Sequence, residues 1–199
     1  MWHNIAEHKN KHKGKKAIVV GTGPSADSLK HKDEILIGVN RAIILSENYS
    51  YVFVDSDYSL DVVAKYHKNT KYICVPFWAR EKMTQNAPIV KTLQDKILLF
   101  ALTYECPSIY NAPEYSLNDS LLHIYWGTVQ PALHFCKLIG ISEIKLCGVD
   151  GTVEKETNCK KIEKTFGIPK KRIQRTIEDY KKTKQKINEI SKLIGIKID

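Results

Sequence analysis

The sequence lacks the features that mark membrane, repeat and disordered proteins. It has no internal repeat, and its amino terminus, MWHNIAEHKNKHKGKK, is polar and basic with no apolar core. Such a segment is neither a signal peptide nor a membrane span, and it predicts a cytoplasmic protein. With 43% hydrophobic and 27% charged residues, the 199-residue chain has an ordinary globular composition, which predicts a single domain with one sizeable core.

Cysteine pairs at metal-binding spacing are also absent. The five cysteines include no CxxC pair and no His/Cys cluster at zinc spacing, and their odd number argues against a complete disulfide framework. We therefore expect reduced thiols. Cys74, Cys136 and Cys147 lie within apolar runs and are predicted to be small core residues.

Basic charge is concentrated at the two ends of the chain. Residues 1–16 hold five lysines and one glutamate, and residues 151–199 hold fourteen Lys or Arg against seven Asp or Glu, in a chain of net charge +9. Basic ends of this kind attract nucleic acid, anionic membrane surfaces or acidic sugars. No aromatic residues interleave the lysines, and no helix-turn-helix or RNP pattern occurs, so we expect no nucleic-acid partner. Solvated helix faces explain most of these lysines, and peripheral contact with an anionic membrane stays open.

The segment AIVVGTGPS, residues 17–25, carries the clearest functional signal. A strand that stops at Gly21 and turns through Gly23 brings backbone N–H groups close to an anion, because neither residue has a Cβ. Proline suits the first position of a following helix, and the serine adds a hydroxyl donor. A strand-to-helix turn without a ligand is the alternative. The predicted nucleotide-binding residues of this turn are Gly21, Thr22, Gly23, Pro24 and Ser25.

The dinucleotide fingerprint G-x-G-x-x-G/A also fits Gly21, Gly23 and Ala26. That fingerprint needs an acidic residue after the second strand, to bind the ribose hydroxyls, but the strand EILIGVN ends in Asn40. NAD and FAD are therefore disfavoured. An amide both donates and accepts hydrogen bonds, so Asn40 suits a base or a ribose.

Short apolar runs alternate with helix-like segments along most of the chain. Strands that are apolar almost throughout are typical of a parallel sheet covered on both faces. The pattern predicts an α/β, Rossmann-like fold with a mostly parallel sheet and helices on both faces. The predicted strands are 17–21, 34–40, 49–57, 71–77, 95–102, 142–150 and a short one within 194–198, and the helix-like segments include 41–47, 59–68 and 128–139.

We expect a single Rossmann-like domain over residues 1–199 with three additions. Residues 1–14 are a basic N-terminal extension, and residues 151–192 are a basic helical tail. Residues 103–127 break the rhythm with two prolines and little periodicity, and they are predicted to form a lid-like loop. An ordered surface loop without a binding role is the alternative there.

Small, amide or acidic residues follow several of the predicted strands. Ligands of open parallel sheets collect at the carboxyl ends of the strands, which here supply the glycine turn, Asn40, Asp55 and Asp150. The turn at Gly127 and Thr128, where a helix begins, adds further N–H donors for a phosphate or carboxylate. These residues together predict a nucleotide pocket.

Two further candidates concern metal binding and proton transfer. Asp55-Ser56-Asp57 has the D-x-D form that holds Mg or Mn in many sugar-nucleotide transferases, although Asp57 also suits the cap of a helix beginning at Ser59. A transferase also needs a general base. His123 is the histidine nearest the predicted pocket, and Asp150 is the acidic candidate.

Four blocks in order resemble a known family: GKKAIVVGTGPSADSL, ILIGVNRAI, VFVDSD and GTVQPALHFCKLIGISEIKLCGVD. This Rossmann-like family joins archaeal 6-hydroxymethylpterin diphosphokinases, motility-associated flagellin glycosyltransferases and, more distantly, bacterial lipooligosaccharide sialyltransferases. The resemblance spans residues 14–150. In the sialyltransferase branch the Gly-Pro-Ser turn and the asparagine after the second strand hold a CMP donor. The resemblance implies this role for Gly21, Gly23, Ser25 and Asn40.

The resemblance implies a glycosyltransferase that moves a sugar, such as a nonulosonic acid, from a CMP donor to a surface glycan or protein, with no cofactor required. The amides of Gly23 and Gly127 are then expected to neutralise the departing phosphate. A pyrophosphokinase of the pterin type, with Mg-ATP held by Asp55 and Asp57, is one alternative. A non-catalytic nucleotide-binding module is another, because no histidine follows His134, whereas the sialyltransferase branch takes its base from beyond that point.

Overall fold

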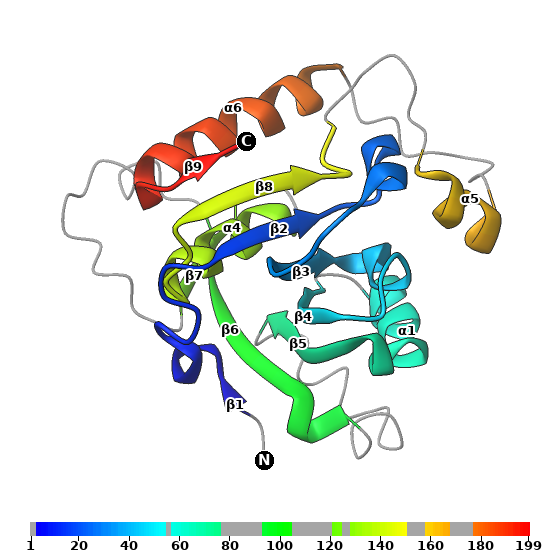
Figure 1. Cartoon of the computed structure of the whole chain (residues 1–199), viewed down its shortest axis with the longest axis horizontal. Helices are drawn as coiled ribbons and strands as arrows, with labels where there is room; N and C mark the ends of the chain where they lie inside the picture. Colours follow the sequence, from blue (N-terminus) through cyan, green and yellow to red (C-terminus); the bar gives the residue numbers. More distant parts are fainter. Residues whose placement is uncertain are drawn as a thin grey trace.

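The structure, a computed structural model, describes residues 3–54, 57–76, 93–104, 121–124, 128–150, 158–167 and 177–199. Its centre is a sheet in which every strand pair is parallel (Figure 1). The strands are β1 (His3–Asn4), β2 (Lys16–Val20), β3 (Ile35–Val39), β4 (Tyr49–Phe53), β5 (Thr70–Pro76), β6 (Ile97–Tyr104), β7 (Leu121–Ile124), β8 (Glu143–Cys147) and β9 (Lys197–Ile198).

The strand order is β1-β6-β5-β4-β3-β2-β8-β9, and β7 also pairs with β6. The α-helices are α1 (Asp57–Lys65), α4 (Val129–Leu138), α5 (Lys160–Phe166) and α6 (Ile177–Ile194), and the 3-10 helices are η1 (Ile5–His8), η2 (Pro24–Ser28), η3 (Asn40–Ile44), η4 (His67–Asn69) and η5 (Gln94–Lys96). This parallel α/β architecture confirms the predicted fold class.

Helical elements cover both faces of the sheet, as the apolar strands predicted. Ala17 and Val19 of β2 pack in one buried cluster with residues of α4 and α6. Ile18 and Val20, which point to the other face, pack in a second cluster with residues of η2, η3, α1 and α5. Successive strand residues therefore enter opposite cores, which explains why these strands do not alternate between polar and apolar.

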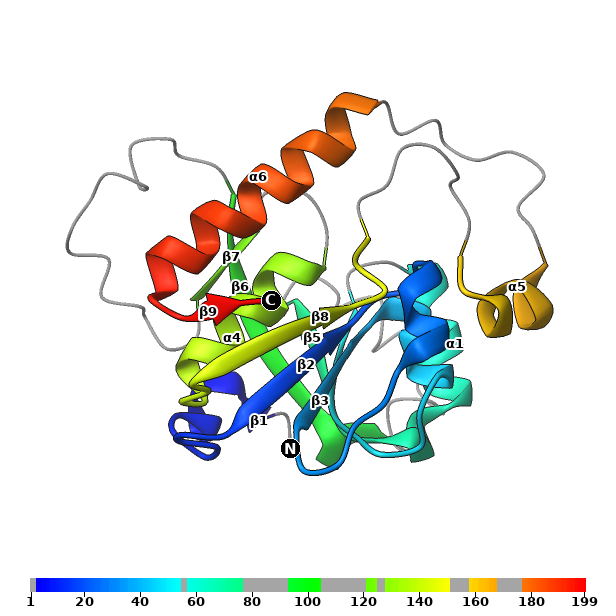
Figure 2. The ribbon, with the colours of Figure 1, turned by 45° about the horizontal axis from the view of Figure 1, so that its top comes forward.

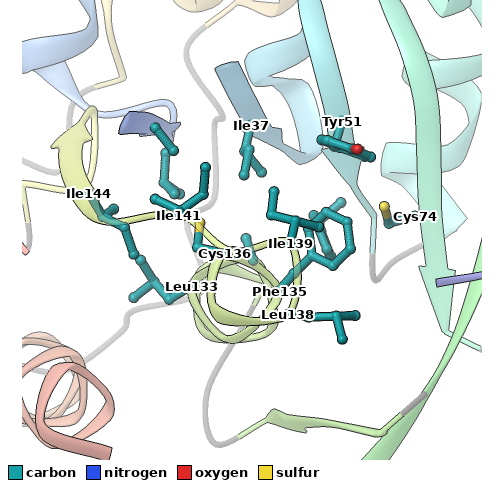
Figure 3. Close-up of a cluster of buried hydrophobic side chains, with 14 of the residues drawn as sticks. Ile37, Tyr51, Cys74, Leu133, Phe135, Cys136, Leu138, Ile139, Ile141 and Ile144 are labelled. Carbon is teal, nitrogen blue, oxygen red and sulfur yellow. The ribbon is translucent and has the colours of Figure 1, made fainter. Parts of the chain in front are cut away.

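Helix α4 packs against the face of the sheet that carries Ala17 and Val19, and most of its residues are buried. Figure 3 shows Phe135 of this helix pointing toward Tyr51 of β4, and Leu133 toward Ile144 of β8. Their burial follows from their apolar side chains, which pack against the sheet. His134 is also buried in this helix, at 2% exposure.

The connections after β2 and β3 differ from the prediction. The chain forms the 3-10 helices η2 and η3 there, whereas α-helices were expected from Pro24 and over 41–47. Only 14 residues separate Val20 from Ile35, and η2 together with its flanking turns fills that distance. The helix predicted from Ser59 begins at Asp57.

The ends of the chain also depart from the expected layout. Residues 3–4, assigned to an extension, form β1 and pair with Leu98 and Leu99 of β6. The predicted loop 103–127 begins within β6 and includes β7, whose residues pair with 101–104; residues 105–120 and 125–127 lie outside the described part. The tail contains α5 and α6, and β9 confirms the short strand predicted near the end.

A buried polar cluster ties the N-terminal segment to the sheet. His8 is 2% exposed, its Nδ1 lies 2.8 Å from the Tyr51 hydroxyl, and Nε2 of His12 lies 2.9 Å from the same oxygen. Burial lowers the pKa of His8 to about 4 and also lowers the pKa of His12. Tyr51 stacks in turn on Tyr72, with ring centroids 5.5 Å apart. These histidines therefore belong to the packed structure.

The predicted thiol state is confirmed for four of the five cysteines, and Cys106 lies outside the described residues. Cys74, Cys136, Cys147 and Cys159 are free and buried. Burial raises the pKa of each thiol, which disfavours the reactive thiolate. Across the described ranges, no helix has the length and apolar character needed to cross a bilayer.

Candidate functional site

The candidate site lies at the carboxyl end of β2, where the glycine turn meets the segment that follows β8. The N–H of Gly21 donates to the Cys147 carbonyl at 2.7 Å, and the N–H of Gly23 donates to the Gly148 carbonyl at 2.8 Å. Figure 2 shows the tips of β2 and β8 lying side by side at this edge. The turn is thus an extension of the pairing between the two strands.

The prediction that these two amides face an anionic ligand is wrong. Protein carbonyls accept both N–H groups, so neither is available to a phosphate. The glycines are required for a different reason. A Cβ on Gly21 would collide with the carbonyl oxygen of Gly148, and a Cβ on Gly23 would collide with the carboxylate of Asp150. The close approach of the segment after β8 to this turn requires glycine at both positions.

Asp150 supplies the anion that contacts this turn. Its Oδ2 accepts the Ser25 N–H at 3.1 Å, and the Ser25 hydroxyl accepts the Gly148 N–H at 2.7 Å. The structure therefore brings Asp150 to the glycine turn, as predicted, although 125 positions separate it from Ser25. Sequence reasoning missed this reciprocal contact, because nothing local to either segment indicates which partner it will meet.

Asn40 stands at the next strand tip in an unusual conformation. Its φ is +52°, in the left-handed region that non-glycine residues seldom adopt and that asparagine tolerates best. Its Nδ2 donates to the Thr128 hydroxyl at 2.7 Å, and Thr128 is 4% exposed. The structure thus joins the predicted residues Asn40 and Thr128, from segments 88 positions apart.

The two halves of the site lie at one edge of the sheet. Val20 pairs with Gly38 in the β2–β3 register, so the turn after β2 and Asn40 after β3 leave the sheet at the same level. Helix α4 begins directly after Thr128 and directs its N-terminal N–H groups toward this edge. The site therefore offers a carboxylate, an amide, a hydroxyl and a helix N-terminus.

Helix α5 is attached to the same turn. The Cys159 N–H donates to the Thr22 carbonyl at 2.8 Å, and the Lys160 N–H donates to both carboxylate oxygens of Asp27, at 3.0 and 3.1 Å. The Arg41 guanidinium lies over the Phe166 ring, 5.6 Å from its centroid. Thr22, which was predicted to contact nucleotide, thus uses its carbonyl to anchor this helix.

Other predicted site residues are not placed in the site. Asp55 and Gly127 lie outside the described residues, and Asp57 and His123 are described only in their backbone. His123 lies on β7, with β6, β5, β4 and β3 between it and β2 in the sheet. No group of three or more His, Cys, Asp or Glu in the described ranges could hold a metal ion, and metal binding by Asp55 and Asp57 stays a prediction.

Comparison with known proteins gives a likeness of fold. No family model and no curated protein matches the chain. The sialyltransferase CstII from Campylobacter jejuni, in complex with the substrate analogue CMP-3FNeuAc, is 18% identical, with 92% of this chain and 80% of that chain covered and a TM-score of 0.56. The MAf glycosyltransferase from Magnetospirillum magneticum is 15% identical over 77% of this chain, with a TM-score of 0.46, and this chain spans only 27% of its length.

Proposed function

We propose that this chain is a glycosyltransferase that takes a sugar of the nonulosonic acid class from a CMP donor and transfers it to a surface glycan or protein. Two lines support the proposal. The sequence blocks resemble a family that includes such enzymes, and the fold is similar to that of a sialyltransferase whose solved complex holds a CMP-sugar analogue. A fold alone does not fix function, so the proposal depends on the site.

The observation that carries the proposal is the contact between Asn40 and Thr128. It joins the asparagine after the second parallel strand to the start of α4, the two segments expected to bind the donor. The left-handed φ of Asn40 stores conformational strain, which proteins retain mainly where geometry at a site requires it. A nucleotide lying along the carboxyl edge would meet this amide and the N-terminus of α4 together.

The mechanism follows from which groups remain available. The amide of Gly23 is bonded to the Gly148 carbonyl, so the positive end of α4 takes over the role of stabilising the departing phosphate. Asp150 is the carboxylate at this edge, and it acts as the general base that deprotonates the acceptor hydroxyl in a direct displacement. The contact from the Ser25 N–H orients that carboxylate.

The nucleotide preference of the purified protein tests the proposal. Calorimetry against a panel of nucleotides, with and without magnesium, should show binding of CMP that does not depend on magnesium. Slow release of CMP from a CMP-sugar without acceptor, lost in Asp150→Asn, distinguishes an enzyme from a binding module. Magnesium-coupled ATP binding in place of CMP binding would indicate a pyrophosphokinase, and tight CMP binding with no turnover would indicate the non-catalytic module.

Removal of the Asn40 side chain should weaken CMP binding. A hydrogen bond from this amide to the bound nucleotide is expected to contribute about 1–3 kcal/mol, so its loss should raise Kd roughly 5- to 150-fold. Because alanine is also strained at this φ, the variants Asn40→Ala and Asn40→Gly are measured together. Both should bind weakly, while Asn48→Ala, at an exposed position before β4, should bind as the parent does. Normal affinity in Asn40→Gly would remove the amide from the site.

A further inference from the structure

A group of lysines without acidic partners lies at the end of the sheet opposite the candidate site. In Figure 1, η1 and the turns that follow it lie beside the start of β2, away from its tip. The N–H groups of Asn10, His12 and Gly14 donate to the carbonyls of residues 138, 139 and 140, at 2.8 to 2.9 Å. The lysines between these positions therefore project beside the end of α4, which carries Lys137.

We define the lysine patch as Lys11, Lys13, Lys15, Lys71 and Lys137, all of which are exposed. Lys11 lies over the Tyr72 ring, 5.9 Å from its centroid, and Lys71 precedes Tyr72 near the start of β5. Burial is the main cause of the lowered pKa of His12, and the positive charges of Lys15, Lys71 and Lys11 lower it further. The patch thus gathers residues from the N-terminal turns, β5 and α4.

The charge of this patch is not neutralised within the part of the chain that the structure describes. None of its five lysines forms an ion pair there, whereas Lys16, just outside it, contacts Glu143 at 2.7 Å. Glu7, a nearby acid, bonds His3 and the Asn4 N–H instead. Five like charges held together by a fixed backbone repel one another, so the patch favours an anionic partner.

The surroundings of the patch select the type of partner. Leu193 is the only large hydrophobic side chain that is exposed among those the structure describes. Single-stranded nucleic acids are bound through exposed aromatic side chains that stack on the bases, and a stable protein interface needs an apolar core; the described surroundings of the patch offer neither. A lipid surface needs only positive charge, and each lysine near it contributes independently. We propose that the lysine patch docks this protein on an anionic lipid bilayer.

Co-sedimentation with lipid vesicles tests this docking directly. The full chain should bind vesicles of phosphatidylcholine mixed with phosphatidylglycerol at about 0.1 M salt, and it should release them as salt rises and the Debye length shortens. The triple variant Lys11→Glu, Lys13→Glu and Lys15→Glu should bind at least about 100-fold more weakly, because three attractive charges become repulsive. Vesicles of phosphatidylcholine alone should not bind either protein.

A matched variant separates the patch from the overall positive charge. Lys145→Glu, Lys164→Glu and Lys192→Glu make the same change in net charge at exposed positions on β8, α5 and α6. This control should retain most of the vesicle binding. Equal losses in the two triple variants, no binding of the parent protein to anionic vesicles, or tighter binding to RNA than to vesicles would each overturn the proposal. All these variants keep the buried residues, and circular dichroism checks their fold.

Discussion

Replacing Gly148 by alanine should lower the free energy of unfolding by about 3 kcal/mol or more. This is the largest change in stability that we predict for a single substitution. Gly148 has a φ of +70°, which costs a residue with a Cβ about 1–2 kcal/mol. The new Cβ would also lie 2.5 Å from the Gly21 carbonyl oxygen and 2.8 Å from Ala26 Cβ. Overpacking of this kind adds about 1–3 kcal/mol. Urea denaturation measures the free energy of unfolding.

The control is a glycine that also has a positive φ but has free space around it. Gly167 has a φ of +74°, and nothing lies within 4 Å of the position of its Cβ. Gly167→Ala should therefore cost only the conformational part, about 1–3 kcal/mol, without the contribution from overpacking. Similar losses in the two variants would mean that the β2 and β8 tips separate easily. The glycine turn would then not be held by this packing.

Acidification from pH 6.5 to pH 4 should progressively destabilise the protein through the cluster around Tyr51. The pKa of His8 is about 4 when folded, against 6.5 for an unperturbed histidine, because the ring is buried. Between pH 4 and pH 6.5 the unfolded chain binds more protons at this histidine than the folded protein does. The contribution of His8 to the free energy of unfolding is therefore fully present above pH 6.5 and is lost as the pH falls toward 4. The full pKa shift of His8 corresponds to about 3 kcal/mol of folding stability. Water that reaches the ring and small movements of the structure around it reduce the expected loss to about 1–2 kcal/mol.

Acidic residues also respond to this pH range, so a variant is needed to isolate the histidine. His8→Gln keeps a hydrogen-bonding group near the Tyr51 hydroxyl but removes the titration. The free energy of unfolding of this variant should fall less steeply between pH 6.5 and 4, while lower stability at pH 7 is expected from imperfect packing. Parallel pH profiles for the two proteins would show that the His8 ring becomes protonated without opening the cluster.

The fold class could be predicted because it depends on local pattern. Near-continuous apolar runs such as ILIGV of β3 indicate strands buried on both faces, and the structure shows both faces covered. The placement of Asn40 and Thr128 at one edge of the sheet could also be predicted, because parallel strands bring their carboxyl ends together; the hydrogen bond between them could not. Predictions of this kind depend only on the order and direction of the strands, and not on how the side chains pack.

The inner arrangement of the site could not be predicted, because it depends on contacts between distant segments. A G-x-G turn has the same sequence whether its amides face a ligand or the carbonyls of residues 147 and 148. The role of His8 was hidden for a related reason, since its partner Tyr51 lies 43 positions away on β4. A histidine within a lysine-rich stretch indicates solvent exposure until the neighbouring strand is placed.

The borders of the sheet have a consequence for solubility. One border ends in β9, with two residues, and the other in β1 and β7, with two and four residues. A long, flat outer strand offers unpaired N–H and C=O groups on which a second chain can add a strand and begin to aggregate. Within the residues that the structure describes, these border strands are too short to serve as such a template. Concentrated solutions of the folded protein should therefore resist the growth of intermolecular β-structure.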